Sequence, residues 1–266
     1  MNGNNLLIHC PEKQGYTPIF DCGQYGMKLT AFGLLRLAPG AVYPLATGEC
    51  ECALVFLGGR AGIAGKNFAF ANIGGRSSVF DGKPHTVYLP RRTACTVTAL
   101  TPVEIAVNWS PASRDTANPT LIAPETTREL IIGRDNFTRK ATIILDETFD
   151  SEHFYIGEGL IPSGNWSGYP PHRHDFDRLP EEIDMEETYF YRFDPPQGFG
   201  IQKVYTEDGR IDETYTVKNN DTVAIAEGYH PLCGAPGYAM YYLWTMAGAV
   251  NRGLISRKDP EHAWVK

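Results

Sequence analysis

Apolar and polar residues alternate along this chain in short runs separated by clusters of Gly, Pro, Asn and Asp, and helical periodicity is scarce. Short alternating runs predict β-strands, because side chains on a strand point in turn to its two faces. The 27 glycines and 19 prolines supply turns between the runs. This pattern predicts an all-β sandwich or barrel. The clearest runs cover residues 34–37, 53–57, 85–89, 103–107, 142–145, 189–191, 200–205, 222–225 and 238–243.

The two halves of the chain contain similar segments in the same order, which indicates an internal repeat. Residues 86–90 align with residues 222–226 at an offset of 136. Glu51 and Glu187 have the same offset, and each begins an apolar run. The sequence therefore predicts a duplicated barrel in which Glu51 is the counterpart of Glu187.

A third pair of segments has a different spacing. Residues 37–39 resemble residues 160–162 at an offset of 123, which is 13 less than the offset of the other two pairs. The change falls in a region where the second half has the polar segment 175–186, with six acidic residues. We expect this segment to be a loop inserted in the second half alone.

The repeat divides the chain into two predicted domains. Residues 1–120 would form the first barrel and residues 121–266 the second, with a polar, turn-rich linker within residues 110–140. Barrels of this kind often pair through their edges, so a homo-oligomer is expected.

Composition and charge narrow the class of protein. The 266 residues are 42% hydrophobic, enough for a substantial core, and the net charge of −7 without a basic stripe argues against nucleic-acid binding. No stretch has the roughly 18 apolar residues that span a membrane. The first residues lack the features of a signal peptide. We expect a cytoplasmic protein whose six cysteines, including Cys50 and Cys52, are thiols.

Four residues form the strongest candidate for a chemical site. His172 and His174 lie two apart, Glu187 begins an apolar run, and His230 follows a later run. Residues i and i+2 of a strand share a face, so the two histidines can direct both imidazoles at one ion. A carboxylate and a third imidazole from neighbouring strands would complete a metal site with open positions for substrate.

This order of ligands resembles the metal motif of the cupins, which are small β-barrels with the metal in the mouth. The gap between His174 and Glu187 is longer than in that motif, and Glu182 and Glu186 lie nearby. Strand parity favours Glu187, because it places tyrosines at 189 and 191 on the ligand face, whereas Glu186 would place Phe190 and Arg192 there.

The first half lacks a matching set of imidazoles. No histidine lies between His9 and His85, and Ala94 occupies the position that aligns with His230. The first barrel is therefore predicted to be free of metal, with one ion per chain.

A closer resemblance covers nearly the whole chain. Residues 164–175, 195–202, 212–217 and 228–231, together with 79–84 and 133–139, resemble the 5-deoxy-glucuronate isomerase family of myo-inositol catabolism, which is a bicupin family. The resemblance implies two tandem cupin barrels. It also implies an aldose–ketose isomerase that converts 5-deoxy-D-glucuronate, a small sugar acid, to 2-deoxy-5-keto-D-gluconate.

The same resemblance implies that His172, His174, Glu187 and His230 ligate one divalent ion. Zn²⁺ is favoured by similarity to a sister family that isomerises 4-deoxy-5-ketouronates from pectin. The donor set would also suit Mn²⁺, Fe²⁺ or Ni²⁺.

The remaining roles have several candidates. A general base must reach the C–H bond, and Tyr189, Tyr191, Glu158, His153 or a metal-bound hydroxide could serve. For substrate binding, Gln202, Lys203 and Arg192 are the candidates, whereas Arg173 points away from the ligand face on a regular strand.

Three other functions fit parts of the pattern. The pectin-pathway isomerase shares the fold and the metal ligands, but the run at 195–200 favours the inositol branch. A cupin dioxygenase could use the same ligands with Fe²⁺, and it predicts an apolar pocket. A sugar-binding bicupin without catalytic activity is the third alternative, and no helix-turn-helix accompanies it.

Overall fold

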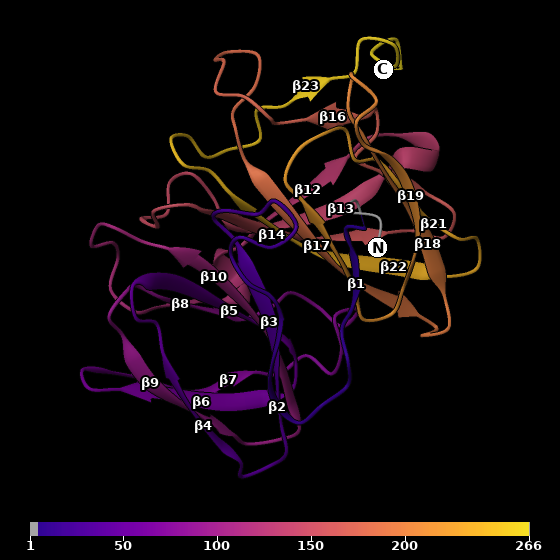
Figure 1. Ribbon diagram of the computed structural model, residues 1–266. Helices are drawn as coiled ribbons and strands as arrows, with labels where there is room; N and C mark the ends of the chain where they lie inside the picture. The colour runs from indigo at the N-terminus through magenta and orange to yellow at the C-terminus, as the bar shows by residue number, and fades with distance from the viewer. Residues whose placement is uncertain (1–4, 266) are drawn as a thin grey trace.

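The computed structural model describes residues 5–265 and confirms the predicted all-β fold. Its only helices within that range are two short 3₁₀ turns, η1 (Pro124–Thr126) and η2 (Asp135–Phe137). The strands form two lobes that follow one another along the chain, and the colours in Figure 1 separate them clearly. No helix among the described residues is long and apolar enough to cross a membrane.

The first lobe pairs a six-stranded sheet with a four-stranded one. The larger sheet has the order β11 (Thr120–Ile122), β8 (Thr86–Leu89), β5 (Cys50–Gly58), β10 (Val103–Pro111), β3 (Ala31–Leu37), β2 (Gly15–Phe20). The smaller sheet has the order β4 (Val42–Ala46), β9 (Ala94–Ala99), β6 (Arg60–Gly65), β7 (Phe68–Gly74).

The second lobe repeats this plan. Its larger sheet has the order β1 (Leu7–His9), β20 (Asp221–Ile225), β17 (Glu186–Asp194), β22 (Ala239–Ala247), β14 (Phe154–Ile161), β13 (Arg139–Leu145), β12 (Arg128–Ile132). Its smaller sheet has the order β15 (Trp166–Ser167), β21 (Leu232–Gly234), β18 (Phe199–Tyr205), β19 (Asp212–Lys218). A two-stranded pair, β16 (His172–Arg173) with β23 (Arg257–Lys258), lies beside them.

The strand orders correspond one for one, as a duplication requires. In the larger sheets β8-β5-β10-β3-β2 corresponds to β20-β17-β22-β14-β13, and in the smaller sheets β4-β9-β6-β7 corresponds to β15-β21-β18-β19. Two strands depart from a simple division of the chain at residue 120. Strand β11 still pairs with β8, and the early strand β1 crosses to pair with β20 of the second lobe.

The buried apolar side chains form three groups. One fills the first lobe between its two sheets, and another fills the second lobe. The third lies between the two large sheets, where Phe32 of β3 contacts Phe190 of β17 at 5.6 Å between ring centroids. Both faces of each large sheet are therefore covered, which explains why β5 and β17 are buried along nearly their whole length.

The predicted match between Glu51 and Glu187 is wrong by one residue. Cys52 pairs with Leu89 between β5 and β8, and Glu187 pairs with Ile225 between the equivalent strands β17 and β20. Leu89 and Ile225 correspond at the offset of 136, so Cys52 holds the position of Glu187. A shift of one residue moves a side chain to the other face of its strand. Glu51 consequently points between the lobes, where its carboxylate accepts hydrogen bonds from the backbone N–H groups of residues 152 and 153, each at 2.8 Å.

Glu186 is the true counterpart of Glu51. Its carboxylate accepts hydrogen bonds from the backbone N–H groups of Lys28 at 2.7 Å and Leu29 at 2.6 Å, in the loop before β3. Strand β3 is the first-lobe equivalent of β14. Each lobe thus extends one buried carboxylate into the loop that leads to the corresponding strand of the other lobe, which fixes how the two large sheets pack.

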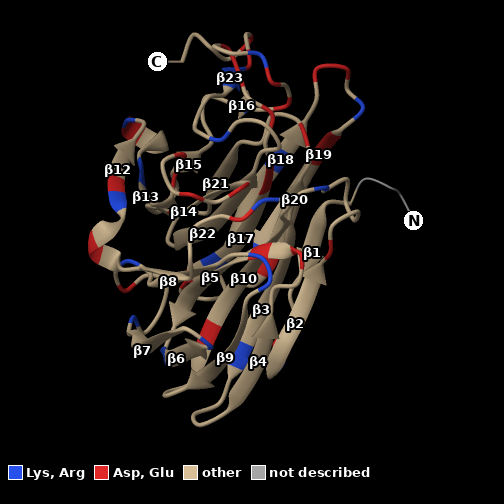
Figure 2. Cartoon of the chain, turned by 90° about the vertical axis from the view of Figure 1, so that its left-hand side faces the viewer, with Lys and Arg blue, Asp and Glu red and all other residues tan. Residues whose placement is uncertain are grey.

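Charged residues of both signs are spread over the elements in Figure 2. All six cysteines are free thiols, as predicted. Burial raises the pKa of the Cys52 thiol well above its usual value, so this side chain stays protonated and behaves as an apolar core residue.

Candidate metal centre

Three of the four predicted ligands meet inside the second lobe. Nε2 of His174 lies 3.0 Å from the Glu187 carboxylate, and Nε2 of His230 lies 3.2 Å from the same oxygen, Oε2. The three candidate donor atoms lie within 4.8 Å of one another, and all three residues are buried. Glu187 comes from β17, His230 precedes β21, and His174 follows β16, so three separate segments build the cluster.

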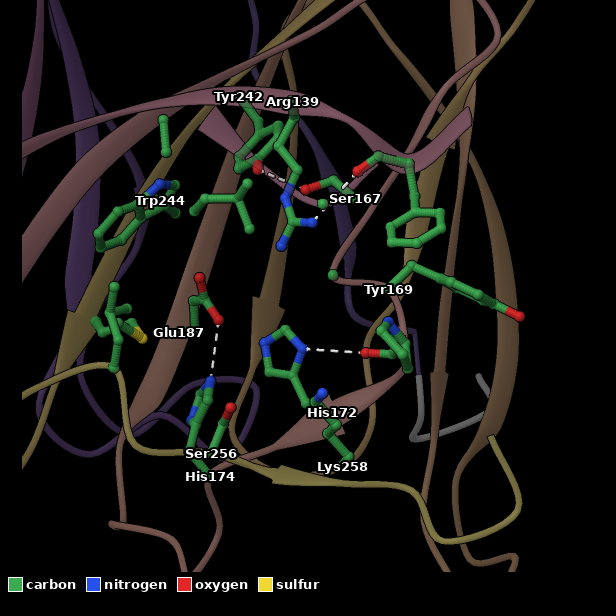
Figure 3. A pocket seen from close by; sticks show the side chains of 18 of the residues that line it. Arg139, Ser167, Tyr169, His172, His174, Glu187, Tyr242, Trp244, Ser256 and Lys258 are labelled. Carbon is green, nitrogen blue, oxygen red and sulfur yellow. Dashed lines mark hydrogen bonds and ion pairs between the residues drawn. The ribbon is translucent and has the colours of Figure 1, made fainter. Parts of the chain in front are cut away.

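The fourth predicted ligand, His172, lies beside this cluster. Its ring centroid is 5.1 Å from that of His230 and 6.4 Å from that of His174. Figure 3 shows His172 and His174 entering the same pocket from below, with the Glu187 carboxylate above the His174 ring in this view. The H-x-H pair therefore places both imidazoles on one side, as strand periodicity predicts.

Backbone carbonyls orient the imidazoles. Nδ1 of His174 bonds the carbonyl of Met185, Nδ1 of His230 bonds that of Gly228 at 2.7 Å, and Nδ1 of His172 faces that of Pro170 at 3.4 Å. A carbonyl only accepts hydrogen bonds, so each contact favours the tautomer with its proton on Nδ1. The Nε2 lone pairs are then free to bind a cation, an arrangement typical of metal-binding histidines.

One buried nitrogen fits the role of a metal ligand. Nε2 of His230 is completely buried and, despite its nearness to Glu187, has no partner with hydrogen-bond geometry among the described residues. Leaving such an atom unsatisfied costs roughly 1–3 kcal/mol. A divalent ion at this point would satisfy it, and three imidazoles with one carboxylate form a donor set that suits such an ion.

The electrostatics of the site are consistent with this. Burial lowers the pKa of His172 to about 3, helped by the neighbouring His230 and His174, so its imidazole is neutral. Burial by itself would raise the pKa of Glu187, but the close contacts of its carboxylate with the His174 and His230 imidazoles outweigh this effect and hold the pKa well below the usual value. Burial opposes the charged form of His174, but Glu187 outweighs burial and raises the pKa of His174. The site thus keeps an ionised carboxylate beside the neutral imidazole of His172.

Three of the candidate ligands, His172, His174 and Glu187, border a pocket of about 410 Å³. One wall is apolar, with Ala141 and Ile143 from β13 and Met246 from β22. The sequence did not identify the polar groups of the remaining walls. They are Arg139, Ser167, Tyr169, Tyr242, Ser256 and Lys258, and Trp244 lies among them. The only sequence signal for Arg139 was its place at the end of the family-like segment 133–139.

Two glycines of β14 make room for the aromatic side of the pocket. A Cβ added at Gly159 would lie 2.2 Å from the Tyr242 ring, and one added at Gly157 would lie 2.2 Å from the Trp244 ring. The rings can therefore cross β14 only because these positions lack side chains. This arrangement leaves the Tyr242 hydroxyl 2.7 Å from Oγ of Ser167.

We expect Gly159→Ala to destabilise the protein by about 1–3 kcal/mol, because the new methyl group must displace the buried Tyr242 ring. Urea unfolding followed by tryptophan fluorescence would measure the change. Gly62→Ala is the matched control, since its Cβ would meet its nearest neighbour at an ordinary 3.7 Å. Equal stability of the two variants would contradict this account.

The two predicted catalytic tyrosines lie on the same face of β17. Tyr189 lines the pocket, while Tyr191 lies behind it with the two rings stacked at 6.1 Å. Burial and the nearby Glu187 raise the pKa of Tyr189 well above its usual value, so this phenol stays protonated. It can donate a hydrogen bond, but it is a poor general base.

Glu158 does not reach the pocket. It alternates with Gly157 and Gly159, which face the aromatic rings, and so points to the opposite side of β14, between the lobes. There its carboxylate binds the Arg76 guanidinium at 3.1 Å and accepts a hydrogen bond from the Tyr241 hydroxyl at 3.0 Å. His153 is also outside the residues that line the pocket.

The predicted substrate-binding residues are not brought to the pocket either. Lys203 is 41% exposed and pairs with Asp212 at 2.5 Å. Arg192 points between the lobes and pairs with Glu104 at 2.6 Å. Gln202 is buried under the site, where its amide donates to the carbonyl of His230 at 2.8 Å, so it supports a candidate ligand without lining the pocket.

The acidic residues near Glu187 have other partners. Glu186 binds the loop before β3, and Glu182 accepts a hydrogen bond from Arg173 at 3.3 Å. Arg173 points away from the cluster, as its place between the histidines predicts, and also pairs with Glu207 at 3.2 Å. Strand parity therefore selected the glutamate that the structure places beside the imidazoles.

Comparisons with known proteins agree with this fold. A 5-deoxy-glucuronate isomerase of Geobacillus kaustophilus is 40% identical over 265 residues, covering 98% of this chain and 95% of the relative. The crystal structure of an IolB-like protein from Salmonella typhimurium superposes with a TM-score of 0.93 at 33% identity, covering 98% and 99% of the two chains.

A more distant structure has the same fold. An oxalate decarboxylase from Bacillus subtilis superposes with a TM-score of 0.65 at 12% identity, covering 93% of this chain and 78% of that one. The model of the KduI/IolB family matches residues 7–265, nearly the entire length of the protein. The chain belongs to the KduI/IolB family.

Proposed function

We propose that this protein is a 5-deoxy-glucuronate isomerase, which converts the aldose 5-deoxy-D-glucuronate to the ketose 2-deoxy-5-keto-D-gluconate in inositol catabolism. The observation that carries the proposal is the buried cluster of His174, Glu187 and His230 beside a pocket with both polar and apolar walls. The relative named for this activity is similar over nearly its whole length. Membership of a family with relatives named for this activity supports a catalytic role for the cluster.

Aldose–ketose isomerisation removes a proton from a hydroxyl-bearing carbon and returns one to the neighbouring carbonyl carbon, with no net redox change. His172, His174, Glu187 and His230 would hold a divalent ion that acts as a Lewis acid toward the carbonyl and the adjacent hydroxyl. Tyr189 lines the pocket and is kept protonated by burial, so it would donate a hydrogen bond to a sugar oxygen. Tyr191 donates to the Gln202 side chain at 2.5 Å, which supports the backbone of His230.

We infer one divalent ion per chain, with Zn²⁺ favoured over Mn²⁺, Fe²⁺ and Ni²⁺ by resemblance to the sister isomerases. Within residues 5–265 the only group of histidine and acidic side chains with metal-site spacing is the one around Glu187. Cys52 takes the position of that glutamate in the first lobe. Elemental analysis of purified protein should give a ratio near one, and two ions per chain would refute a metal-free first lobe.

The activity is tested by incubating metal-replete protein with 5-deoxy-glucuronate and following the aldehyde proton by NMR. Loss of that signal with a new ketone carbon, and no oxygen uptake, is the expected result. Turnover of 4-deoxy-5-ketouronates alone would favour the pectin-pathway isomerase. Oxygen consumption would indicate a dioxygenase, and binding of the sugar acid without turnover would indicate a sensor.

We also infer that the protein is a cytoplasmic homo-oligomer. Six free cysteines suit a reducing compartment, and the exposed apolar side chains of Ile131, Leu254 and Trp264 offer contact surface. Light scattering would test the assembly, and a mass equal to one chain would contradict it.

A further inference from the structure

We propose that Arg139 binds the carboxylate of the sugar acid and thereby sets which end of the substrate faces the metal ligands. This rests on the proposed function, because it assigns the substrate's orientation in the same pocket. Arg139 is the first residue of β13, where it pairs with Ile132 of β12. Its side chain shares a face of β13 with Ala141 and Ile143, which both line the pocket.

The guanidinium lies across the pocket from the histidines. In Figure 3 Arg139 descends from the upper wall toward the open space, while His172 and His174 rise from the lower wall. A ligand held at both ends would therefore lie between the imidazoles and the guanidinium. The neighbouring hydroxyls of Tyr242 and Ser167, 2.7 Å apart, add polar atoms at the Arg139 end.

Arg139 retains hydrogen-bonding capacity for a ligand. A guanidinium has five N–H donors, and the contacts of this one are the carbonyl of Phe137 at 3.4 Å and the Tyr242 hydroxyl. No carboxylate among residues 5–265 lies within ion-pair distance of it, although the side chain is half-buried. Most other arginines of the chain have such partners; Arg76 and Arg192, for example, are paired with glutamates. A planar fork without an anion matches a carboxylate that arrives with the substrate.

The shape of the sugar acid fits this orientation. Its reacting carbonyl and its carboxylate are at opposite ends of the carbon chain, so a carbonyl at the imidazoles places the carboxylate near Arg139. The 5-deoxy carbon is a methylene adjacent to the carboxylate. The side chains next to Arg139 along β13, Ala141 and Ile143, are apolar and would contact a methylene without leaving a hydroxyl unpaired.

Lys258 is the other cation of the pocket and the natural competitor for this role. It lies on β23, paired with His172 of β16, and its side chain is exposed. An exposed ammonium is well hydrated and contributes less to anion binding than a half-buried guanidinium. Its place beside His172 would also direct the carboxylate toward the reacting end.

The test compares Arg139→Gln with the wild type on 5-deoxy-glucuronate and on 5-deoxy-glucose, the neutral sugar that has a hydroxymethyl group in place of the carboxylate. We expect kcat/KM for the acid to fall about 100-fold and kcat/KM for the neutral sugar to change less than about 3-fold. Arg139→Lys should recover part of the loss. Arg134→Gln, an exposed residue outside the pocket, is the matched control and should resemble the wild type.

A binding measurement separates this proposal from the proposed function. Calorimetric titration would use the unreactive acid made by reducing the aldehyde of 5-deoxy-glucuronate to an alcohol, with metal content and melting temperature checked for each variant. Arg139-dependent binding without turnover by the wild type would refute the isomerase and support the subsite. Two results would overturn the subsite. In the first, the wild type turns over the acid, but Arg139→Gln loses the same factor in kcat/KM on the acid and on the neutral sugar. In the second, binding of the acid is lost in Lys258→Gln and not in Arg139→Gln.

Discussion

His174→Ala is expected to abolish metal retention and to reduce isomerase activity by at least about 100-fold, while the protein remains folded. Nε2 of His174 is 3.0 Å from the Glu187 carboxylate, and its Nδ1 is fixed by the carbonyl of Met185. Loss of a group that merely orients a ligand typically costs 10–100-fold in metal affinity or activity. Loss of the ligand itself should cost more.

The fold should survive because His174 follows the short strand β16 and borders the pocket rather than the packed core. Elemental analysis, the NMR assay and circular dichroism would measure the three effects. His9→Ala is a suitable control, since that histidine is 69% exposed and lies outside the pocket. A full complement of metal in the His174→Ala protein would exclude His174 as a ligand.

Arg76→Met is expected to destabilise the protein by about 3–5 kcal/mol without loss of metal. Arg76 and Glu158 form an ion pair between the lobes in which each side chain is only 3% exposed. Removing one partner of such a pair leaves an uncompensated buried charge, and this cost is of that size. Urea unfolding would measure the change in the free energy of unfolding.

The loss of stability caused by Arg76→Met should depend on pH. Burial raises the pKa of Glu158 even beside Arg76, and loss of the guanidinium removes the main group that opposes this rise. The folded variant would then bind a proton that the unfolded chain releases near its ordinary pKa of about 4.3. Its stability should therefore decrease as pH rises from that value to the folded-state pKa, and recover in acid.

The double variant Arg76→Met/Glu158→Leu provides the internal comparison. Replacing a buried ion pair by apolar side chains of similar size is often neutral for stability. We expect the second substitution to restore most of the loss and to remove its dependence on pH. A single variant as stable as the wild type would mean that water reaches Glu158, contrary to the packing in the structure.

Local sequence patterns predicted the fold class and two of the candidate metal ligands. Alternating short runs with Gly and Pro turns predict strands because side-chain direction alternates with every residue. The H-x-H spacing predicts two imidazoles on one face for the same reason. Parity along β17 also separated Glu187 from Glu186, whose carboxylate binds the loop before β3 instead.

Sequence reasoning failed where the strand register was unknown. Glu51 aligned with Glu187 by sequence offset, but strand pairing places Cys52 at that position and turns Glu51 toward the other lobe. Glu158 was assigned to the site because it lies on a strand near the histidines. The glycines on either side of it face the pocket rings, so Glu158 faces Arg76.

The sequence by itself thus determined that this protein is built of strands, because side-chain direction alternates along a single strand. It also identified His172, His174, Glu187 and His230 as candidate ligands, from the H-x-H spacing and from their resemblance to the cupin metal motif. Only the tertiary structure decided which face of each strand becomes pocket and which becomes the contact between lobes. It also brought Arg139 and Tyr242 opposite the histidines. These relations depend on pairing between segments far apart in the chain, and local periodicity contains no information about that pairing.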